Sequence, residues 1–501
     1  MKTKDDRPRA HRAWLPAACA ALAVLLVPSW ALIGAGFVKG RGAFDQLNYH
    51  EQVVRTFAEQ LPTPDFHDYL SATTPGYHTA LAVVARVISD DRQVLQWFGS
   101  LFTVALIVLL AWGVRGPPGP ASRRAAHPAV LVLPLAASMA VFYSATWMLP
   151  DNAGWLGVLA VWLLALRPRF DAITIFGGGL ALAALILVRQ IHLWPLAMLL
   201  TAAWLGSSSD EDSPFDFAAD MRALLSNIPA SLARVLLIAL AAIPAIAALV
   251  YFWLLWDRTL TPPVFDDRHV GGNPAAPAFV LAVFGPFSLC FLPFVLDGLR
   301  LLWVRHTWLL AVALITGLLV ALAPETTRNY FEGRYSGLWE IVRHLPAPLG
   351  RSVLVVPLAL LGAVMLAAWF VVLPRRDRWI MLAAMVAFTA AQCASFKLWQ
   401  RYTEPMVLLW LALAAARVAP PRSGAGQGWR IVGPAALTLA MAAITAASLF
   451  TARPVQRRSM IAPWETQAPL LPGMVERFGE FNEPAGHEPP DPPDDQPPAD
   501  R

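Results

Sequence analysis

The stretch at positions 352–374, SVLVVPLALLGAVMLAAWFVVLP, carries no charged side chain and is followed at once by Arg375, Arg376 and Arg378. A helix needs about 20 predominantly apolar residues to cross a bilayer, and this stretch is long enough. A basic flank is typical of the cytoplasmic end of a span. Similar apolar runs recur along the chain, so the sequence predicts an all-α, polytopic transmembrane protein.

The composition supports this class. Of 501 residues, 57% are hydrophobic and only 15% are charged, and the mean hydropathy is +0.51. A soluble protein is usually close to half apolar and about a quarter charged. The net charge of +5 comes from small basic groups between apolar runs, so we expect no nucleic-acid partner. Cys19, Cys290 and Cys393 lie in apolar segments and predict neither disulfides nor a metal cluster.

Apolar runs of span-like composition occur about thirteen times along the chain. Several are short for a span, which leaves the count open by one or two. We place the spans at 14–36, 95–114, 128–147, 152–166, 172–188, 191–206, 231–256, 277–296, 304–323, 352–374, 379–395, 403–418 and 430–450.

Basic residues set the expected orientation. Residues 1–13 are rich in Lys and Arg and should be cytoplasmic, and every second loop is basic in turn except the acidic loop from Ser207 to Asp220. The first apolar run is too long for a signal peptide, so we read it as a retained anchor. The membrane domain therefore covers 14–450. The Pro- and Asp-rich tail at 451–501 is predicted to be disordered, on the outer side.

The first outer loop, residues 37–94, contains two amphipathic patterns. Apolar residues recur at helical spacing within 45–61 and within 75–89. Counting 75–89 as a span would place the basic residues at 115–124 outside. We therefore predict two helices that lie at the outer membrane surface.

The positive-inside rule explains basic residues on the cytoplasmic side but not those on the outer side. The outer basic residues are therefore the ones that can indicate a functional site. Arginine binds phosphate through charge-assisted, often bidentate hydrogen bonds. The alternative for each is that it snorkels to lipid headgroups. The outer basic residues are Arg189, Arg258, Arg268, Arg328, Arg334, Arg343, Lys397 and Arg401. Arg189 is the most suggestive, because it lies between two short apolar segments, where a charge is costly and usually has a partner.

Several outer carboxylates are candidates for chemistry. Asp45 could take a proton from an acceptor hydroxyl, or it could cap the helix that starts there. Asp151 could orient an acceptor, or it could cap the fourth span. Asp65, His67 and Asp68 are spaced too loosely to predict a metal site, and we expect no metal. The polar group at 266–269 is more typical of a flexible solvated loop.

Four separated patches resemble one known family. In the first outer loop, that family has an Asp-Glu pair followed by His, and Asp45-Gln46 with His50 keeps the first acid and the His. The family then has a Thr-Thr-x-Pro-Gly segment that ends in Tyr. Thr73-Thr74-Pro75-Gly76-Tyr77 is similar but one residue shorter.

The remaining patches lie further along the chain in the same order. The family has Arg-Gln-Thr-Asn with a nearby Trp, and Arg189-Gln190 with Trp194 keeps the first pair and the Trp. Arg401-Tyr402 with Pro405 is similar to an Arg-Tyr pair near the family's C-terminus. Arg328-Asn329-Tyr330 is a weaker match to an Arg-x-Tyr patch.

The patches resemble those of polytopic glycosyltransferases that use polyprenyl-phosphate sugars and have the C-type glycosyltransferase fold. The closest likeness is to dolichyl-phosphate-glucose-dependent α-1,2-glucosyltransferases, and we expect a distant bacterial member. The resemblance implies an inverting hexosyltransferase, with glucose as the first candidate sugar and a lipid-phosphate sugar as donor. It implies no cofactor, and a glycan, lipid or protein acceptor at the outer face of the plasma membrane.

The resemblance also assigns roles to residues. Asp45 would be the catalytic base. The donor phosphate or substrate would be bound by Arg189, Gln190, Arg328, Tyr330, Arg401 and Tyr402, with support from His50, Thr74 and Asp151. The alternative function is a transporter or flippase of lipid-linked or anionic solutes, which needs polar residues and broken helices along a path through the membrane.

Overall fold

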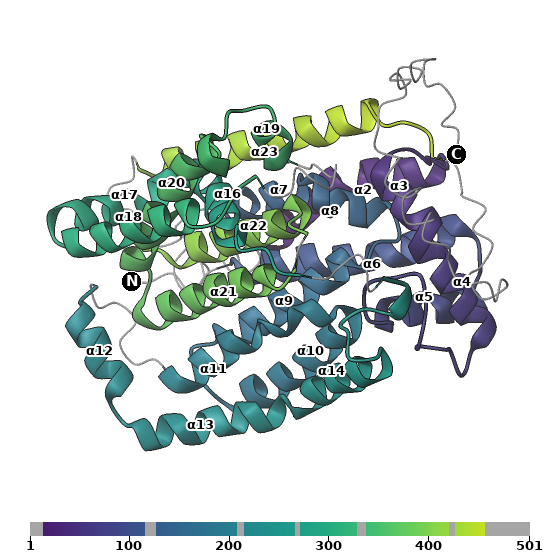
Figure 1. Ribbon diagram of the computed structural model, residues 1–501, viewed down its shortest axis with the longest axis horizontal. Helices are drawn as coiled ribbons and strands as arrows, with labels where there is room; N and C mark the ends of the chain where they lie inside the picture. Colours follow the sequence, from purple (N-terminus) through teal and green to yellow (C-terminus); the bar gives the residue numbers. More distant parts are fainter. Residues whose placement is uncertain are drawn as a thin grey trace, which may run out of the picture.

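The computed structural model describes residues 14–115, 127–207, 215–265, 271–327, 337–395, 397–419 and 426–455. All described elements are helices (Figure 1). Within these ranges there is no β-strand, and one isolated bridge joins Lys39 to Pro454. The prediction of an all-α protein is confirmed. The predicted cytoplasmic segment 1–13, and the tail from 456 onward, lie outside the described residues.

The first half of the chain forms helices around the segment 37–94. These are α2 Trp14–Gly34, α3 Gly40–Asp45, η1 Gln46–His50, α4 Glu51–Gln60, α5 Gly76–Val87, α6 Arg92–Gly113, α7 Pro128–Ala136, α8 Met139–Thr146, α9 Asp151–Ala165, η3 Ile173–Gly177, α10 Gly178–Val188, η4 Gln190–Leu193, α11 Leu196–Leu205, α12 Phe217–Leu225, α13 Ile228–Ala241 and α14 Ile243–Leu255.

The second half continues the helical pattern to the last described residues. Its elements are η5 Pro263–Phe265, α16 Ala276–Cys290, α17 Leu292–Val304, α18 Thr307–Leu322, α19 Leu338–Val342, η7 Pro348–Gly350, α20 Val355–Val372, α21 Arg375–Cys393, α22 Gln400–Arg417 and α23 Gly426–Phe450.

The long apolar helices have the dimensions of membrane spans. Four of them, at 14–34, 92–113, 348–372 and 428–450, are long and apolar enough alone, and three bent helix pairs raise that number to seven. Five further apolar helices are shorter, with 10–17 residues. Each of the thirteen predicted apolar segments is helical for most of its length. These helices are consistent with a membrane protein, although fewer than thirteen meet the length of a span one by one.

Prolines lie at two of the places where predicted spans are divided. The predicted span 277–296 is split at Phe291, and α16 and α17 are bent by 110° there. Pro293 lies in the first turn of α17, where its missing N–H and fixed φ are tolerated. In the same way, Pro244 lies at the start of α14 and divides the predicted span 231–256.

Both helices predicted for the segment 37–94 are present. The first is built from α3, the π-helical turn η1 and α4, and the second is α5. α4 buries Val53, Val54 and Phe57 on one face and packs against α5. Asp91 then caps α6, because its Oδ1 accepts the backbone N–H groups of Gln93 and Val94 at 2.8 and 3.2 Å.

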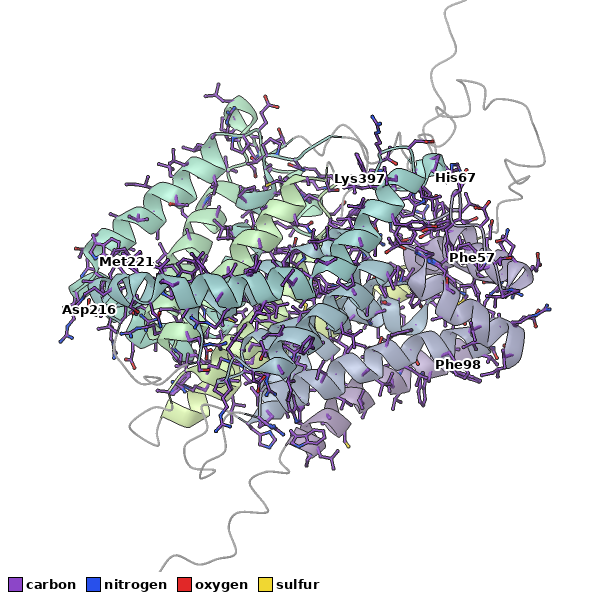
Figure 2. All side chains as sticks on the ribbon, turned by 90° about the horizontal axis from the view of Figure 1, so that it is seen from below. Phe57, His67, Phe98, Asp216, Met221 and Lys397 are labelled. Carbon is purple, nitrogen blue, oxygen red and sulfur yellow. The ribbon has the colours of Figure 1, made fainter. Side chains whose placement is uncertain are left out.

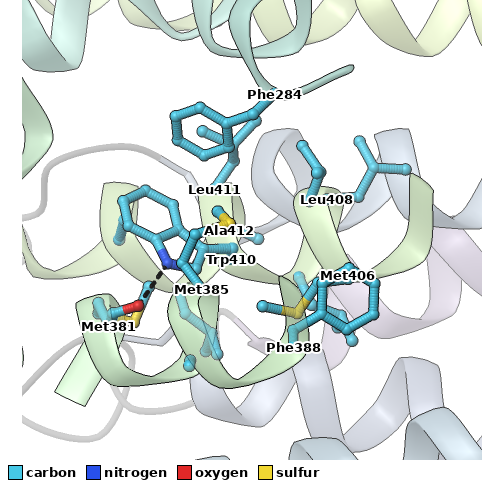
Figure 3. Close-up of a cluster of buried hydrophobic side chains, with 14 of the residues drawn as sticks. Phe284, Met381, Met385, Phe388, Met406, Leu408, Trp410, Leu411 and Ala412 are labelled. Atoms are coloured by element: carbon cyan, nitrogen blue, oxygen red, sulfur yellow. Dashed lines mark hydrogen bonds between the residues drawn. The ribbon is translucent and has the colours of Figure 1, made fainter. Parts of the chain in front are cut away.

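The centre of the bundle is closely packed around α22. Figure 3 shows Trp410 among Phe284, Met381, Met385 and neighbouring apolar side chains. All of these side chains are buried, and the indole Nε1 of Trp410 donates to the carbonyl of Met381 at 2.9 Å. Packing along α22 fixes the position of its first turn, which contains Arg401 and Tyr402.

The labelled side chains of Figure 2 separate two ends of the molecule. Phe57, His67 and Lys397 lie toward one end, and Asp216 and Met221 lie at the opposite end. The predicted topology assigns the first three to outer segments and the last two to an inner loop, and that assignment stays a prediction.

Candidate functional site

Asp45 lies at the junction of α3 and η1, where the helix changes from α to π geometry. Its carboxylate Oδ2 accepts a hydrogen bond from Nη1 of Arg401 at 2.9 Å. The side chain of Asp45 is 15% exposed and that of Arg401 is 34% exposed. Because both side chains are partly exposed, the pair is reachable from solvent, although helices surround it. Single π-helical turns such as η1 occur often at functional sites.

Arg401 has more hydrogen-bonding capacity than its partners use. Its Nη2 donates to the hydroxyl of Tyr402 at 3.0 Å. Its Nε is buried and has no hydrogen-bond partner among the described residues. The guanidinium carbons of Arg41 and Arg401 lie 4.2 and 5.6 Å from the ring centre of Trp399. Two guanidinium groups thus contact one indole ring beside Asp45.

A second ion pair joins Arg189 to Asp151. Asp151 is the first residue of α9 and Arg189 follows the last residue of α10, and their side chains are only 11% and 10% exposed. The guanidinium carbon of Arg189 lies 4.5 Å from the ring centre of Tyr402. Tyr402 therefore connects the buried Arg189–Asp151 pair to the more open Arg401–Asp45 pair.

Neutral histidines border this cluster. Nδ1 of His50 lies 2.9 Å from Nε2 of His78, within hydrogen-bonding distance. Burial lowers the pKa of His50 from 6.5 to about 4, and the nearby charges of Asp45 and Asp151 oppose the shift only in part. Burial, followed by the charge of His50, lowers the pKa of His78 well below its ordinary value. Both rings are therefore uncharged at neutral pH.

The Thr74 and Gln190 patches hold each other in place. The backbone N–H of Thr74 donates to Oε1 of Gln190 at 3.1 Å, and the Thr74 hydroxyl donates to the carbonyl of Ile186 at 2.6 Å. Nε2 of Gln190 donates to the carbonyls of Ala72 and Leu260. The side-chain amide of Gln190 thus forms its hydrogen bonds within the protein. These bonds fix the end of α10 and so the position of Arg189.

Glu51 is one of the buried acids that the sequence patterns did not single out. Its carboxylate accepts from Nε of Arg92 at 2.7 Å and from Nη2 of Arg55 at 3.2 Å, and it also accepts from the amide of Gln46. Burial would raise the pKa of Glu51, but the hydrogen bond and charge of Arg92 outweigh it and lower the pKa. The signal available in the sequence was an acid on the buried face of an amphipathic helix.

Other predicted residues are distributed as follows. Arg258 is exposed, and Arg343 is exposed and pairs with Glu340. Lys397 is buried at the start of the segment that leads into α22. The candidates Arg328 and Tyr330, together with Arg268 and Arg334, lie outside the described residues. The structure thus brings together Asp45, His50, Asp151, Arg189, Arg401 and Tyr402, with Thr74 and Gln190 as supports.

Asp65, His67 and Asp68 make contacts typical of a loop. Oδ1 of Asp65 accepts the N–H of His67 at 2.8 Å, and Oδ1 of Asp68 accepts the N–H of Val264 at 3.2 Å. Across the part of the chain that the structure describes, no group of three or more His, Cys, Asp or Glu side chains is placed to hold a metal ion.

The cluster combines groups that accept protons with groups that bind anions. Asp45 is an accessible carboxylate. The guanidinium groups of Arg401 and Arg189 both lie near the ring of Tyr402. Such a site can take a proton from a hydroxyl and stabilise a phosphate that gains negative charge. Comparison of the chain with models of protein families, with curated proteins and with solved structures finds no match.

Proposed function

We propose that the chain is an integral membrane glycosyltransferase. It moves a hexose from a polyprenyl-phosphate sugar to an envelope glycan, lipid or protein at the outer face of the plasma membrane, with inversion at the anomeric carbon. The observation that carries the proposal is the Asp45–Arg401 pair, in which Nε of Arg401 is buried and has no partner among the described residues. A buried, charged donor without a partner is costly, and an anionic ligand removes that cost.

The guanidinium groups fit the charge change of the reaction. A sugar phosphodiester carries one negative charge, and the lipid phosphate that leaves carries up to two. The guanidinium carbons of Arg401 and Arg189 lie 5.1 and 4.5 Å from the ring centre of Tyr402. Because they are held in place before the reaction, they stabilise the developing charge without reorganisation.

Asp45 is the group best placed to accept the proton. In the proposed step, the acceptor hydroxyl gives its proton to the carboxylate, its oxygen bonds to the anomeric carbon, and the bond from that carbon to the phosphate oxygen breaks. A donor phosphate on Arg401 competes with Asp45 for the guanidinium group. Donor binding therefore weakens the Asp45–Arg401 hydrogen bond and frees the carboxylate when the acceptor arrives.

Substitution of Asp45 tests the proposal. Asp45→Asn keeps the shape of the side chain but removes the base, so we expect transfer from a polyprenyl-phosphate hexose to fall by about 100-fold or more. Asp65→Asn, an exposed acid of the same segment, should retain full activity. Transfer at the original rate by a correctly inserted Asp45→Asn protein would reject the base assignment. Absence of transfer by the unaltered protein, with polyprenyl-phosphate hexoses as donors and an envelope extract as acceptor, would reject the function.

One observation favours the transporter alternative. The helix pair α7 and α8 is bent by 67°, and at the bend the hydroxyl of Ser138 donates to the buried carboxylate of Glu404 at 2.5 Å. Glu404 also accepts from the amide of Gln400 at 2.9 Å. Broken helices with a buried acid are typical of transport sites.

Glu404→Gln separates the two functions. A transporter that uses this acid would lose uptake of lipid-linked or anionic solutes into vesicles, without any release of lipid phosphate. For the proposed transferase, Glu404 lies one turn beyond Arg401 on α22 and serves to hold that turn in place. Transfer should then persist in Glu404→Gln at a reduced rate, and vesicles should show no solute uptake.

A further inference from the structure

A cavity is lined in part by residues of α3 and η1 that are close in sequence to Asp45. Its volume is about 280 Å³, and it forms where α2 ends, α6 begins and α8 ends. Small-molecule pockets usually measure about 300 to 1,000 Å³. The cavity is therefore sized for one small polar unit, such as a single sugar ring.

Polar side chains at the start of α6 line this cavity. Arg92 uses Nε and Nη2 to bind Glu51 and directs no hydrogen bond from Nη1 to the described residues. Asp91 uses Oδ1 for the helix cap, which leaves Oδ2 for another donor. Gln93 and Gln96 add amide groups to the same wall. The lining thus offers both donors and acceptors within a small volume.

Two aromatic rings also line the cavity. Phe37 and Trp147 lie with ring centres 6.5 Å apart, and both line the cavity. Trp147 is only 2% exposed, and its Nε1 has no hydrogen-bond partner among the described residues. Aromatic rings together with charged and amide groups match a sugar ring, which has apolar C–H faces and polar edges.

We propose that this cavity binds one pyranose unit of a carbohydrate acceptor. The inference rests on the proposed function and adds a site for the acceptor to it. Asp45 and Gln46 are consecutive, so their Cα atoms are about 3.8 Å apart. Asp45 faces Arg401, whereas Gln46 lines the cavity and its Oε1 accepts the N–H of Met148 at 3.2 Å. A glycan with one sugar unit in the cavity could therefore extend along η1 toward Asp45.

Direct binding is the first test. Saturation-transfer difference NMR on the full chain in detergent uses methyl α-glucopyranoside, methyl α-mannopyranoside and methyl β-galactopyranoside as probes. We expect at least one to bind the unaltered protein, and Val38→Trp, which fills the cavity, to abolish that signal. Val83→Trp on the exposed face of α5 controls for the added indole. No binding of any probe, or equal binding by Val38→Trp with an unchanged melting temperature, would overturn the proposal.

Kinetics distinguish this site from the donor site. Gln93→Ala removes one lining amide, so we expect the KM for a glycan acceptor to rise about tenfold while the KM for the lipid-phosphate donor stays within about twofold. Gln60→Ala, an amide on the exposed end of α4, should change neither constant. Sugar binding without any transfer would retain the site and reject the transferase. Transfer with an unchanged acceptor KM in Gln93→Ala would reject the site and retain the transferase.

Discussion

The guanidinium carbon of Arg189 lies 4.5 Å from the centre of the Tyr402 ring, and this contact joins the end of α10 to the start of α22. The same guanidinium pairs with Asp151 on α9. Two helices that are close in sequence, α9 and α10, and the distant α22 therefore share contacts with one buried cation. Loss of the Asp151 charge alone and loss of both charges should change the stability of the protein differently, and unfolding experiments can separate the two.

Asp151→Asn should destabilise the protein. It leaves Arg189 buried without its counter-charge, which costs about 3 to 5 kcal/mol. The double variant Asp151→Leu/Arg189→Met removes both charges and should be more stable than Asp151→Asn. Thermal or denaturant unfolding in detergent measures both. A single variant as stable as the unaltered chain would show that the pair is not isolated from water.

Arg401→Lys should separate activity from stability. Lysine keeps the charge but lacks the planar fork that holds both Asp45 and the Tyr402 hydroxyl. Because a third of the Arg401 side chain is exposed, unfolding free energy should change by about 1 kcal/mol or less. Sugar transfer should fall by about 100-fold. Arg343→Lys, in an exposed pair with Glu340, is the matched control, and equal losses in both variants would contradict a special role for Arg401.

The histidine pair predicts loss of stability in acid. The folded pKa of His50 is about 4, against 6.5 for an exposed histidine. As the pH falls from 6.5 to 4, the unfolded chain takes up a proton that the folded chain does not, so the free energy of unfolding decreases. One pKa unit is worth about 1.4 kcal/mol, so His50 alone accounts for a loss of about 3 kcal/mol by pH 4.

Substitution of the histidines checks this assignment. Unfolding free energies of His50→Gln between pH 7 and pH 4 should depend less on pH than those of the unaltered chain. The exposed His67 of the same segment provides the control, and His67→Gln should keep the original slope. An unchanged slope in His50→Gln would mean that other groups cause the acid sensitivity.

Gly154→Ala should lower activity without removing any functional group. A Cβ at Gly154 would lie 3.0 Å from Nε2 of His192, so that ring must shift by a few tenths of an ångström, and it would reach van der Waals contact with Cδ of Arg189 at 3.4 Å. A displacement of a positioned group by a fraction of an ångström reduces transfer, and we expect a loss of about tenfold or more. Gly34→Ala meets no atom within 4 Å and should transfer sugar normally. Equal activity of the two variants would indicate that the site tolerates a shift of the His192 ring beside Arg189.

The helical segments could be predicted because apolar length and periodicity are local properties of the chain. The same properties do not reveal where a proline starts a new helix, as Pro293 does in α17. Two features of the sequence predicted that Asp45 and Arg401 belong to one site. Both residues lie in patches that resemble those of one family and follow its order, and the predicted topology places both on the outer side of the membrane. The partners of Glu51 could not be predicted, because its ion pair with Arg92 depends on how α4 approaches α6.

The Asp45–Arg401 pair joins residues that are 356 positions apart in the sequence. Chains are synthesised at about 5 to 20 residues per second, so roughly 20 to 70 s pass between the synthesis of the carboxylate and that of its cation. During that interval Asp45 is present without the guanidinium that defines the pair. Fragments that end before α22, whether from stalled ribosomes or from truncated genes, therefore cannot form the proposed site, however well their earlier helices insert.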